Sequence, residues 1–212
     1  MEGALRLAAQ DKNWPRERDP FPVESLREWL ARPPSLNPFL WARNAALVSL
    51  GLRTMFRAAE LVKIKLGDIR PKGDGIEVRV GPSKADQNAK RRPVFVDPSG
   101  FLSCPVALTQ ALIAIRRGQG ALDADLLFSD AAGRPLSPSA VSSIVKNMVD
   151  HSGIEGFFSG HSLRIGGASA ALAAGFTVDE VMTLGAWKSD AVRQYLMPLV
   201  TRRRDVSGRF GL

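Results

Sequence analysis

The stretch Gly160-His-Ser-Leu-Arg-Ile-Gly-Gly-Ala-Ser-Ala-Ala-Leu-Ala-Ala174 decides how this chain folds around its functional groups. Its residues after Arg164 are almost all small and apolar, which is typical of a helix packed closely inside a core. His161 and Arg164 stand three positions apart, so they share one face of such a helix. A buried arginine needs a partner, because an unpaired buried charge is costly. We therefore expect a buried helix whose imidazole and guanidinium converge on one anionic group, such as a phosphate.

The chain on both sides of this stretch is predicted to be mostly helical. Apolar residues recur at helical spacing, and Ser, Thr or Pro stands where several helices begin. Leu61, Ile64 and Leu66 are expected to face the core. A capping box, Thr177-Val-Asp-Glu180, opens one short helix. The other predicted helices span about residues 23–30, 38–52, 57–66, 103–115 (capped by Ser103), 137–150 and 189–198.

One part of the chain has the period of a sheet. Ile76-Glu-Val-Arg-Val80 and Pro93-Val-Phe-Val96 alternate apolar with other residues, and Gly73-Asp-Gly75 precedes the first run as a turn. Residues 68–70 can supply a third strand. The predicted fold class is therefore mainly α with a small antiparallel three-stranded β-sheet (α+β).

Composition excludes several classes of protein. The single cysteine, Cys104, permits no internal disulfide, and with His151 and His161 it makes a poor zinc site. No apolar run approaches the roughly 20 residues that span a bilayer, and residues 1–18 have no signal-peptide core. We expect a reduced, intracellular protein without membrane contact, structural metal or cofactor. Lys and Arg total 29 against 21 acids, a formal charge of +8 that favours nucleic acid as the partner.

Tyr195 is the only tyrosine in the chain, and it lies near the basic run Arg202-Arg-Arg204. A phenol is a poor nucleophile at neutral pH, because its ordinary pKa is about 10. To attack phosphorus it needs cations around the phosphate and a group that takes its proton. On its own, an ordinary tyrosine at the edge of the core is the simpler interpretation.

Two motifs together resemble a known family. Gly160-His-Ser-Leu-Arg-Ile-Gly-Gly-Ala-Ser169 and Leu184-Gly-Ala-Trp-Lys-Ser-Asp-Ala-Val-Arg-Gln-Tyr195 look like the C-terminal signature of the tyrosine recombinase (phage integrase) family. The Trp-Lys-Ser-Asp form, with Tyr195 eight residues after Trp187, is similar to the recombinases of Cryptons and tyrosine-recombinase retroelements. The resemblance covers roughly residues 22–200 and implies a tyrosine recombinase catalytic-domain fold.

The resemblance also assigns residues outside these motifs. It implies an earlier arginine followed three residues later by glutamate and then by an Asp-Ile pair, which Arg57 fits and Arg53 does not. It implies a lysine in the hairpin loop, for which Lys84 is chosen over Lys90. Trp187 is expected to pack against the site and to donate its indole N–H to the phosphate, although core packing alone is an equal alternative. The implied catalytic set is Arg57, Lys84, His161, Arg164, Trp187 and Tyr195.

The implied reaction is site-specific DNA cleavage and rejoining through a 3′-phosphotyrosine, used in DNA recombination and integration by mobile elements. The partner would be double-stranded DNA, on which subunits self-associate, as the family does in tetramers. The alternatives are a type IB topoisomerase, which reseals the same strand, and a non-catalytic DNA-binding module derived from a recombinase.

The expected organisation is an N-terminal arm or linker (1–21), a catalytic domain (22–200) and a basic C-terminal tail (201–212). Full-length members of the family usually carry a separate N-terminal helical domain, whereas only a short arm precedes residue 22 here. The protein is expected in the cytoplasm of a prokaryote or the nucleus of a eukaryote.

Overall fold

The computed structural model describes residues 18–34, 37–81 and 92–187. Lys84, Tyr195 and the helix predicted over 189–198 lie outside the described residues. The described helices are α2 (Val23–Ala31), α3 (Pro38–Thr54), α4 (Ala58–Leu61), α5 (Pro105–Gly118), α6 (Pro138–His151), α7 (Gly160–Ala173) and α8 (Val178–Leu184), with a 3-10 turn, η1 (Leu66–Asp68). The strands are β1 (Ile69–Lys72), β2 (Gly75–Val80) and β3 (Arg92–Val96). The predicted fold class, mainly α with a small three-stranded sheet, is confirmed.

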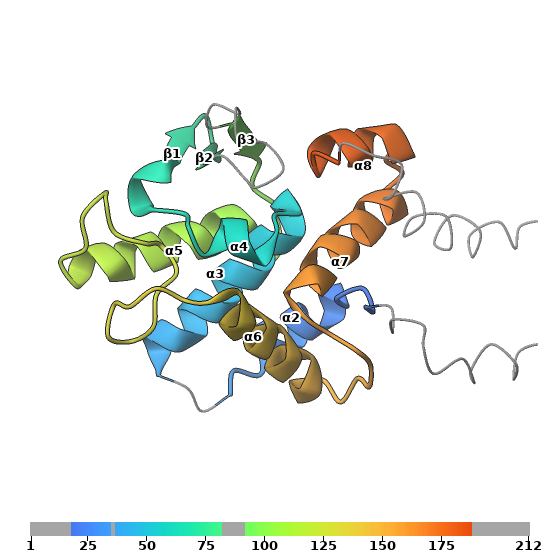
Figure 1. Ribbon diagram of the computed structural model, residues 1–212, viewed down its shortest axis with the longest axis horizontal. Coiled ribbons are helices and arrows are strands. Elements are labelled where there is room, and N and C mark those ends of the chain that lie inside the picture. Colours follow the sequence, from blue (N-terminus) through green and yellow to red (C-terminus); the bar gives the residue numbers. More distant parts are fainter. Residues whose placement is uncertain (1–17, 35–36, 82–91, 188–212) are drawn as a thin grey trace, which may run out of the picture.

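The three strands form an antiparallel sheet in the order β1-β2-β3. Val78 pairs with Ile69 on one side and Val94 on the other, and Ile76 pairs with Val96. The alternate residues Ile76 and Val78 are buried, which is why the sequence alternates there. The sheet thus has one face on the core, above the helices (Figure 1).

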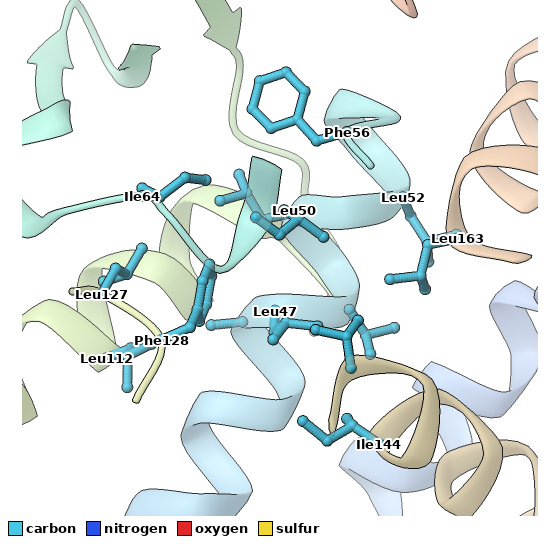
Figure 2. Close-up of a cluster of buried hydrophobic side chains, with 14 of the residues drawn as sticks. Leu47, Leu50, Leu52, Phe56, Ile64, Leu112, Leu127, Phe128, Ile144 and Leu163 are labelled. Carbon is cyan, nitrogen blue, oxygen red and sulfur yellow. The ribbon is translucent and has the colours of Figure 1, made fainter. Parts of the chain in front are cut away.

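Helix α3 is the centre of the molecule and contacts α2, α4, α5, α7 and β3. Its Leu47 and Leu50 are fully buried, in one cluster with Phe128, Leu112 and Leu163. Figure 2 shows Leu47 and Leu50 of α3 among these side chains, which come from neighbouring helices and, for Phe128, from the segment between α5 and α6. This main core holds α3 and the elements around it together, and a second, smaller cluster with Met55, Ala168, Leu172 and Val181 joins α7 to α8.

Helix α7 packs against its neighbours at backbone distance. A Cβ atom on Gly167 would clash with the carbonyl oxygen of Leu52 in α3, and one on Gly166 would lie 2.5 Å from the carbonyl oxygen of Phe21. Only glycine permits these approaches. The small, apolar residues of 165–174 therefore allow the close packing that the sequence predicts, and the buried helix is confirmed.

The prediction of a helix over 57–66 is wrong beyond Leu61. Instead of continuing the helix, the backbone bonds to a distant segment: Leu127 N–H donates to Ile64 O (2.8 Å) and Leu66 N–H donates to Asp125 O (2.9 Å). Leu61, Ile64 and Leu66 are nevertheless all buried, as predicted. The first strand also begins later than predicted, at Ile69 rather than residue 68.

Most of the predicted helix starts are confirmed. The Ser137 side chain accepts a hydrogen bond from the Ala140 N–H at the start of α6, and Thr177 and Glu180 form the predicted capping box of α8. The exception is α5, whose N-cap is Cys104 rather than Ser103. The carbonyl oxygen of Ser103 instead accepts a hydrogen bond from Ser49 Oγ at 2.6 Å.

Candidate active site

The first turn of α7 is fixed from both sides. Gly160 N–H donates to Ser142 Oγ near the start of α6, at 3.0 Å. On the other side, a Cβ atom on Gly160 would lie 2.8 Å from the Cβ of Ala58 in α4. The Ser159 side chain caps the helix by accepting a hydrogen bond from His161 N–H (3.3 Å). This turn therefore presents His161 and Arg164 beside the start of α4.

Arg164 is buried, with 2% of its surface exposed. Its Nη1 donates to the carbonyl oxygen of Met55, and its Cζ lies 3.8 Å from the centroid of the Trp187 ring. Both contacts favour the charged form of the guanidinium inside the protein. Met55 ends α3 in the left-handed conformation, with φ of 54°. The turn that ends α3 thus supplies a hydrogen-bond acceptor for an arginine of another helix.

Arg57 follows the same turn and is the N-cap residue of α4. Its backbone N–H donates to Glu60 Oε2 (2.7 Å), and its guanidinium donates to Glu60 Oε1 at 3.2 Å. The side chain of Arg57 keeps 47% of its surface exposed. The Arg-x-x-Glu spacing has a physical reason here: the glutamate caps the helix and restrains the arginine at once, while the guanidinium stays accessible.

His161 lies among positive charges. The pKa of its imidazole is lowered from its ordinary value, first because the ring is partly buried and then because of the charges of Arg164, Arg57 and Arg18. Its side chain is nevertheless exposed enough to meet a ligand. A lowered pKa keeps the imidazole neutral at neutral pH, so it can either donate or accept a hydrogen bond.

Trp187 follows α8 and is placed by a tight turn. Its N–H donates to Met182 O (3.0 Å), and the preceding Ala186 has a φ of 50°. Its ring covers Gly185 so closely that a Cβ atom there would overlap it. The ring is therefore directed at Arg164 by Gly185 and Ala186, two residues that sequence analysis did not single out.

The structure brings four of the predicted site residues together: Arg57, His161, Arg164 and Trp187. Lys84 and Tyr195 lie outside the described residues. Arg53, the rejected alternative to Arg57, is exposed and borders a pocket lined by the second half of α7, away from His161. Sequence analysis also missed the Met55 carbonyl, and no signal in the sequence marks it.

Neither a metal-binding cluster nor a membrane-spanning helix occurs in the part of the chain that the structure describes. Residues 18–34, 37–81 and 92–187 contain no group of three or more His, Cys, Asp and Glu side chains able to hold a metal ion. His151 makes other contacts: its Nε2 lies 3.0 Å from the Arg32 carbonyl oxygen, and its ring forms a T-shaped pair with Trp29. In the same described ranges, no helix is long and apolar enough to cross a membrane.

The fold matches solved structures of one class. The site-specific recombinase XerH in its post-cleavage complex has a TM-score of 0.70 and 18% identity, over 90% of this chain and 52% of that one. XerA recombinase has a TM-score of 0.66 and 19% identity, over 92% of this chain and 67% of that one. The fold is thus that of tyrosine recombinase catalytic domains.

The sequence comparisons identify the family. The model of the phage integrase family matches residues 34–199, and the chain belongs to that family. An integrase/recombinase xerD homolog of Selenomonas ruminantium is 30% identical over 141 residues, which is 61% of this chain and 39% of that relative. The chain therefore spans well under half the length of this curated relative.

Proposed function

We propose that this chain is the catalytic domain of a tyrosine recombinase, which cleaves and rejoins DNA through a 3′-phosphotyrosine on Tyr195. The observation that carries the proposal is the buried guanidinium of Arg164, held between the Met55 carbonyl and the Trp187 ring beside Arg57 and His161. A cation fixed in a partly dry site stabilises negative charge that develops on a phosphate more strongly than it would in water.

In the proposed reaction, Arg57 and Arg164 bind the non-bridging oxygens of the scissile phosphate. Tyr195 Oη forms a bond to phosphorus, and the bond from phosphorus to the 5′ oxygen breaks. Lys84 gives a proton to that departing oxygen. Because its imidazole is neutral, His161 can accept the phenol proton or form a hydrogen bond with the phosphate. Trp187 donates its indole N–H to the phosphate. A 5′ hydroxyl of a partner strand reverses the step, so neither metal nor ATP is required.

The partner we propose is double-stranded DNA, with several subunits assembled on it. Among the structural neighbours, XerH is bound to difH substrate, and lambda integrase forms a tetramer bound to a Holliday junction. The net charge of +8 supports a polyanionic partner. Within the family, the Trp-Lys-Ser-Asp motif and the spacing from Trp187 to Tyr195 favour the Crypton and retroelement type.

We also propose that residues 22–200 form the catalytic domain, with 201–212 as a basic tail. Such an enzyme would act where its DNA is, in the cytoplasm of a prokaryote or the nucleus of a eukaryote.

The test is a covalent adduct. The substrate is a pool of duplexes that carry one nick and a randomised sequence around it, because the short strand released beside the nick diffuses away and traps the adduct. The chain is incubated with the pool in EDTA, and protein-linked DNA that survives detergent is recovered and sequenced. We expect an adduct from the natural chain and none from Tyr195→Phe, with DNA binding retained.

The same assay separates the alternatives. Binding without an adduct would support a non-catalytic DNA-binding module and contradict the proposal. If the chain forms the adduct and relaxes supercoiled plasmid but exchanges no strands between two duplexes, it is a type IB topoisomerase.

A further inference from the structure

A segment before α2 is built into the surface next to the candidate site. Asp19 N–H donates to Phe157 O (3.1 Å), and Asp19 Oδ2 accepts the Phe157 N–H at 2.7 Å. Phe21 N–H then donates to Ser162 O in the first turn of α7, at 2.9 Å. The segment lies close to the loop between α6 and α7, where a Cβ atom on Gly156 would lie 2.9 Å from Asp19 Oδ2.

These contacts place Arg18 on the ring of Phe157, with Cζ 3.7 Å from the ring centroid. Stacking uses the flat face of the guanidinium, whereas its N–H donors point outward in the plane. The planar edge is the part that binds two phosphate oxygens at once. Within residues 18–34, 37–81 and 92–187, no carboxylate forms an ion pair with Arg18.

Arg18 belongs to the same electrostatic neighbourhood as the candidate site. Its charge acts on the imidazole of His161 together with those of Arg164 and Arg57. Arg164 is buried and fixed by two contacts, whereas Arg18 is exposed and stacked at the rim. Three segments that are far apart in the sequence thus place their arginines around one histidine.

We propose that Arg18, stacked on Phe157, binds a second phosphate of the DNA backbone next to the scissile one. The inference rests on the proposed function, because it takes DNA as the ligand. Arg18 has no part in the chemical step. It fixes the register of the strand, since backbone contacts position a nucleic acid without identifying its sequence.

The experiment measures how the affinity for a fluorescein-labelled, mixed-sequence DNA duplex depends on salt. Each phosphate contact contributes about 0.9 to the slope of log K against log salt concentration. We therefore expect Arg18→Gln to lower the slope by about 1. The ratio of wild-type to variant affinity should then shrink about threefold between roughly 50 and 200 mM salt.

Three further variants complete the design. Arg32→Gln is the matched control, because Arg32 is also exposed, pairs with Glu28, and lies at the opposite end of α6 from the contact with α7. It should keep the wild-type slope. Arg18→Lys retains the charge and should restore most of the slope. Phe157→Leu removes the aromatic ring under Arg18 and should give an affinity between those of the wild type and Arg18→Gln.

The outcomes separate the two proposals. A wild-type slope for Arg18→Gln, or an equal drop for Arg18→Gln and Arg32→Gln, would overturn the second phosphate contact even if the covalent adduct forms. A reduced slope for Arg18→Gln without any adduct from the wild type would leave the contact standing and overturn the cleavage reaction. Wild-type affinity for Phe157→Leu would overturn the role of the ring. Duplex binding without salt dependence would overturn the second phosphate contact, whereas the adduct alone decides the cleavage reaction.

Discussion

At the scale of the residue, Arg164 connects three parts of the molecule. It projects from α7, donates to the carbonyl at the end of α3, and lies under the tryptophan that follows α8. A planar guanidinium offers N–H donors in fixed directions and a flat face for such contacts, whereas a lysine ammonium is a compact point charge. The residue type therefore matters at this position, in addition to the charge.

The first prediction is that Arg164→Lys slows formation of the covalent adduct by about 100- to 1,000-fold, the usual effect of losing one transition-state donor. The measurement is a single-turnover time course on a duplex recovered from the randomised pool. Arg32→Lys, which changes an exposed arginine in the same way, should react at the wild-type rate. An undiminished rate for Arg164→Lys would remove the need for a guanidinium.

The second prediction concerns His161. Because partial burial and three arginine charges lower its pKa, it should titrate below the ordinary histidine value of about 6.5. Arg57→Gln removes one positive charge and should raise the pKa of His161. The measurement is an NMR titration of the two imidazole C2–H signals, with His151→Gln to assign them. A fall or no change in Arg57→Gln would show that the two side chains do not interact.

A histidine whose pKa is lower in the folded state stabilises the fold fully above its unfolded pKa of about 6.5, and this contribution is lost as the pH falls through the folded pKa. Replacing His161 by Gln should therefore flatten the fall of unfolding free energy below about pH 6.5.

At the scale of the element, the position of α7 is set by glycine. Its neighbour at Gly167 is the backbone carbonyl of Leu52, which cannot rotate away as a side chain can. Any larger residue must therefore move the helix that carries His161 and Arg164.

The third prediction is that Gly167→Ala lowers the free energy of unfolding by about 1–3 kcal/mol or more, the cost of overpacking, and slows the adduct as well. The matched control is Gly118→Ala, at the last residue of α5, where a Cβ atom meets nothing within 4 Å. That variant should be neutral or more stable by up to about 1 kcal/mol. Urea unfolding checks both, and equal effects would contradict the close packing of α7 on α3.

The start and type of an element could be predicted from the sequence where the element's own residues determine them. The caps Ser137 and Thr177 act on neighbours along the chain, and the alternation of 76–80 records which side chains of one strand face the core, so the sequence displays both. The helix predicted over 57–66 stops early because Ile64 and Leu66 hydrogen-bond to the 125–127 segment, about sixty residues away. Periodicity cannot reveal such a partner.

At the scale of the whole molecule, the same distinction holds for the site. His161 and Arg164 were predictable as a pair because one helix turn joins them, and the family resemblance supplied Arg57 and Trp187. Arg18 and the Met55 carbonyl could not be predicted, because each matters only through the element that tertiary packing brings to it.

That packing also makes the segment before α2 part of the folded unit. Phe21 has 2% of its surface exposed, lies in the main core cluster, and donates its N–H to Ser162 in α7. Its backbone lies so close to α7 that Gly166 has no room for a side chain. Residues before Val23 thus support the helix that carries Arg164.

The fourth prediction is that Phe21→Ala lowers the free energy of unfolding by about 3–5 kcal/mol, the usual cost of emptying a buried phenylalanine site. This is a large share of the 5–15 kcal/mol or so that stabilises a typical domain. Phe101→Ala is the control, since Phe101 is 66% exposed, and it should change stability by about 0.5 kcal/mol or less. Urea unfolding followed by tryptophan fluorescence measures both. If the two variants unfolded at the same urea concentration, Phe21 would be a surface residue of a free arm, and the position of Arg18 beside α7 would lose its support.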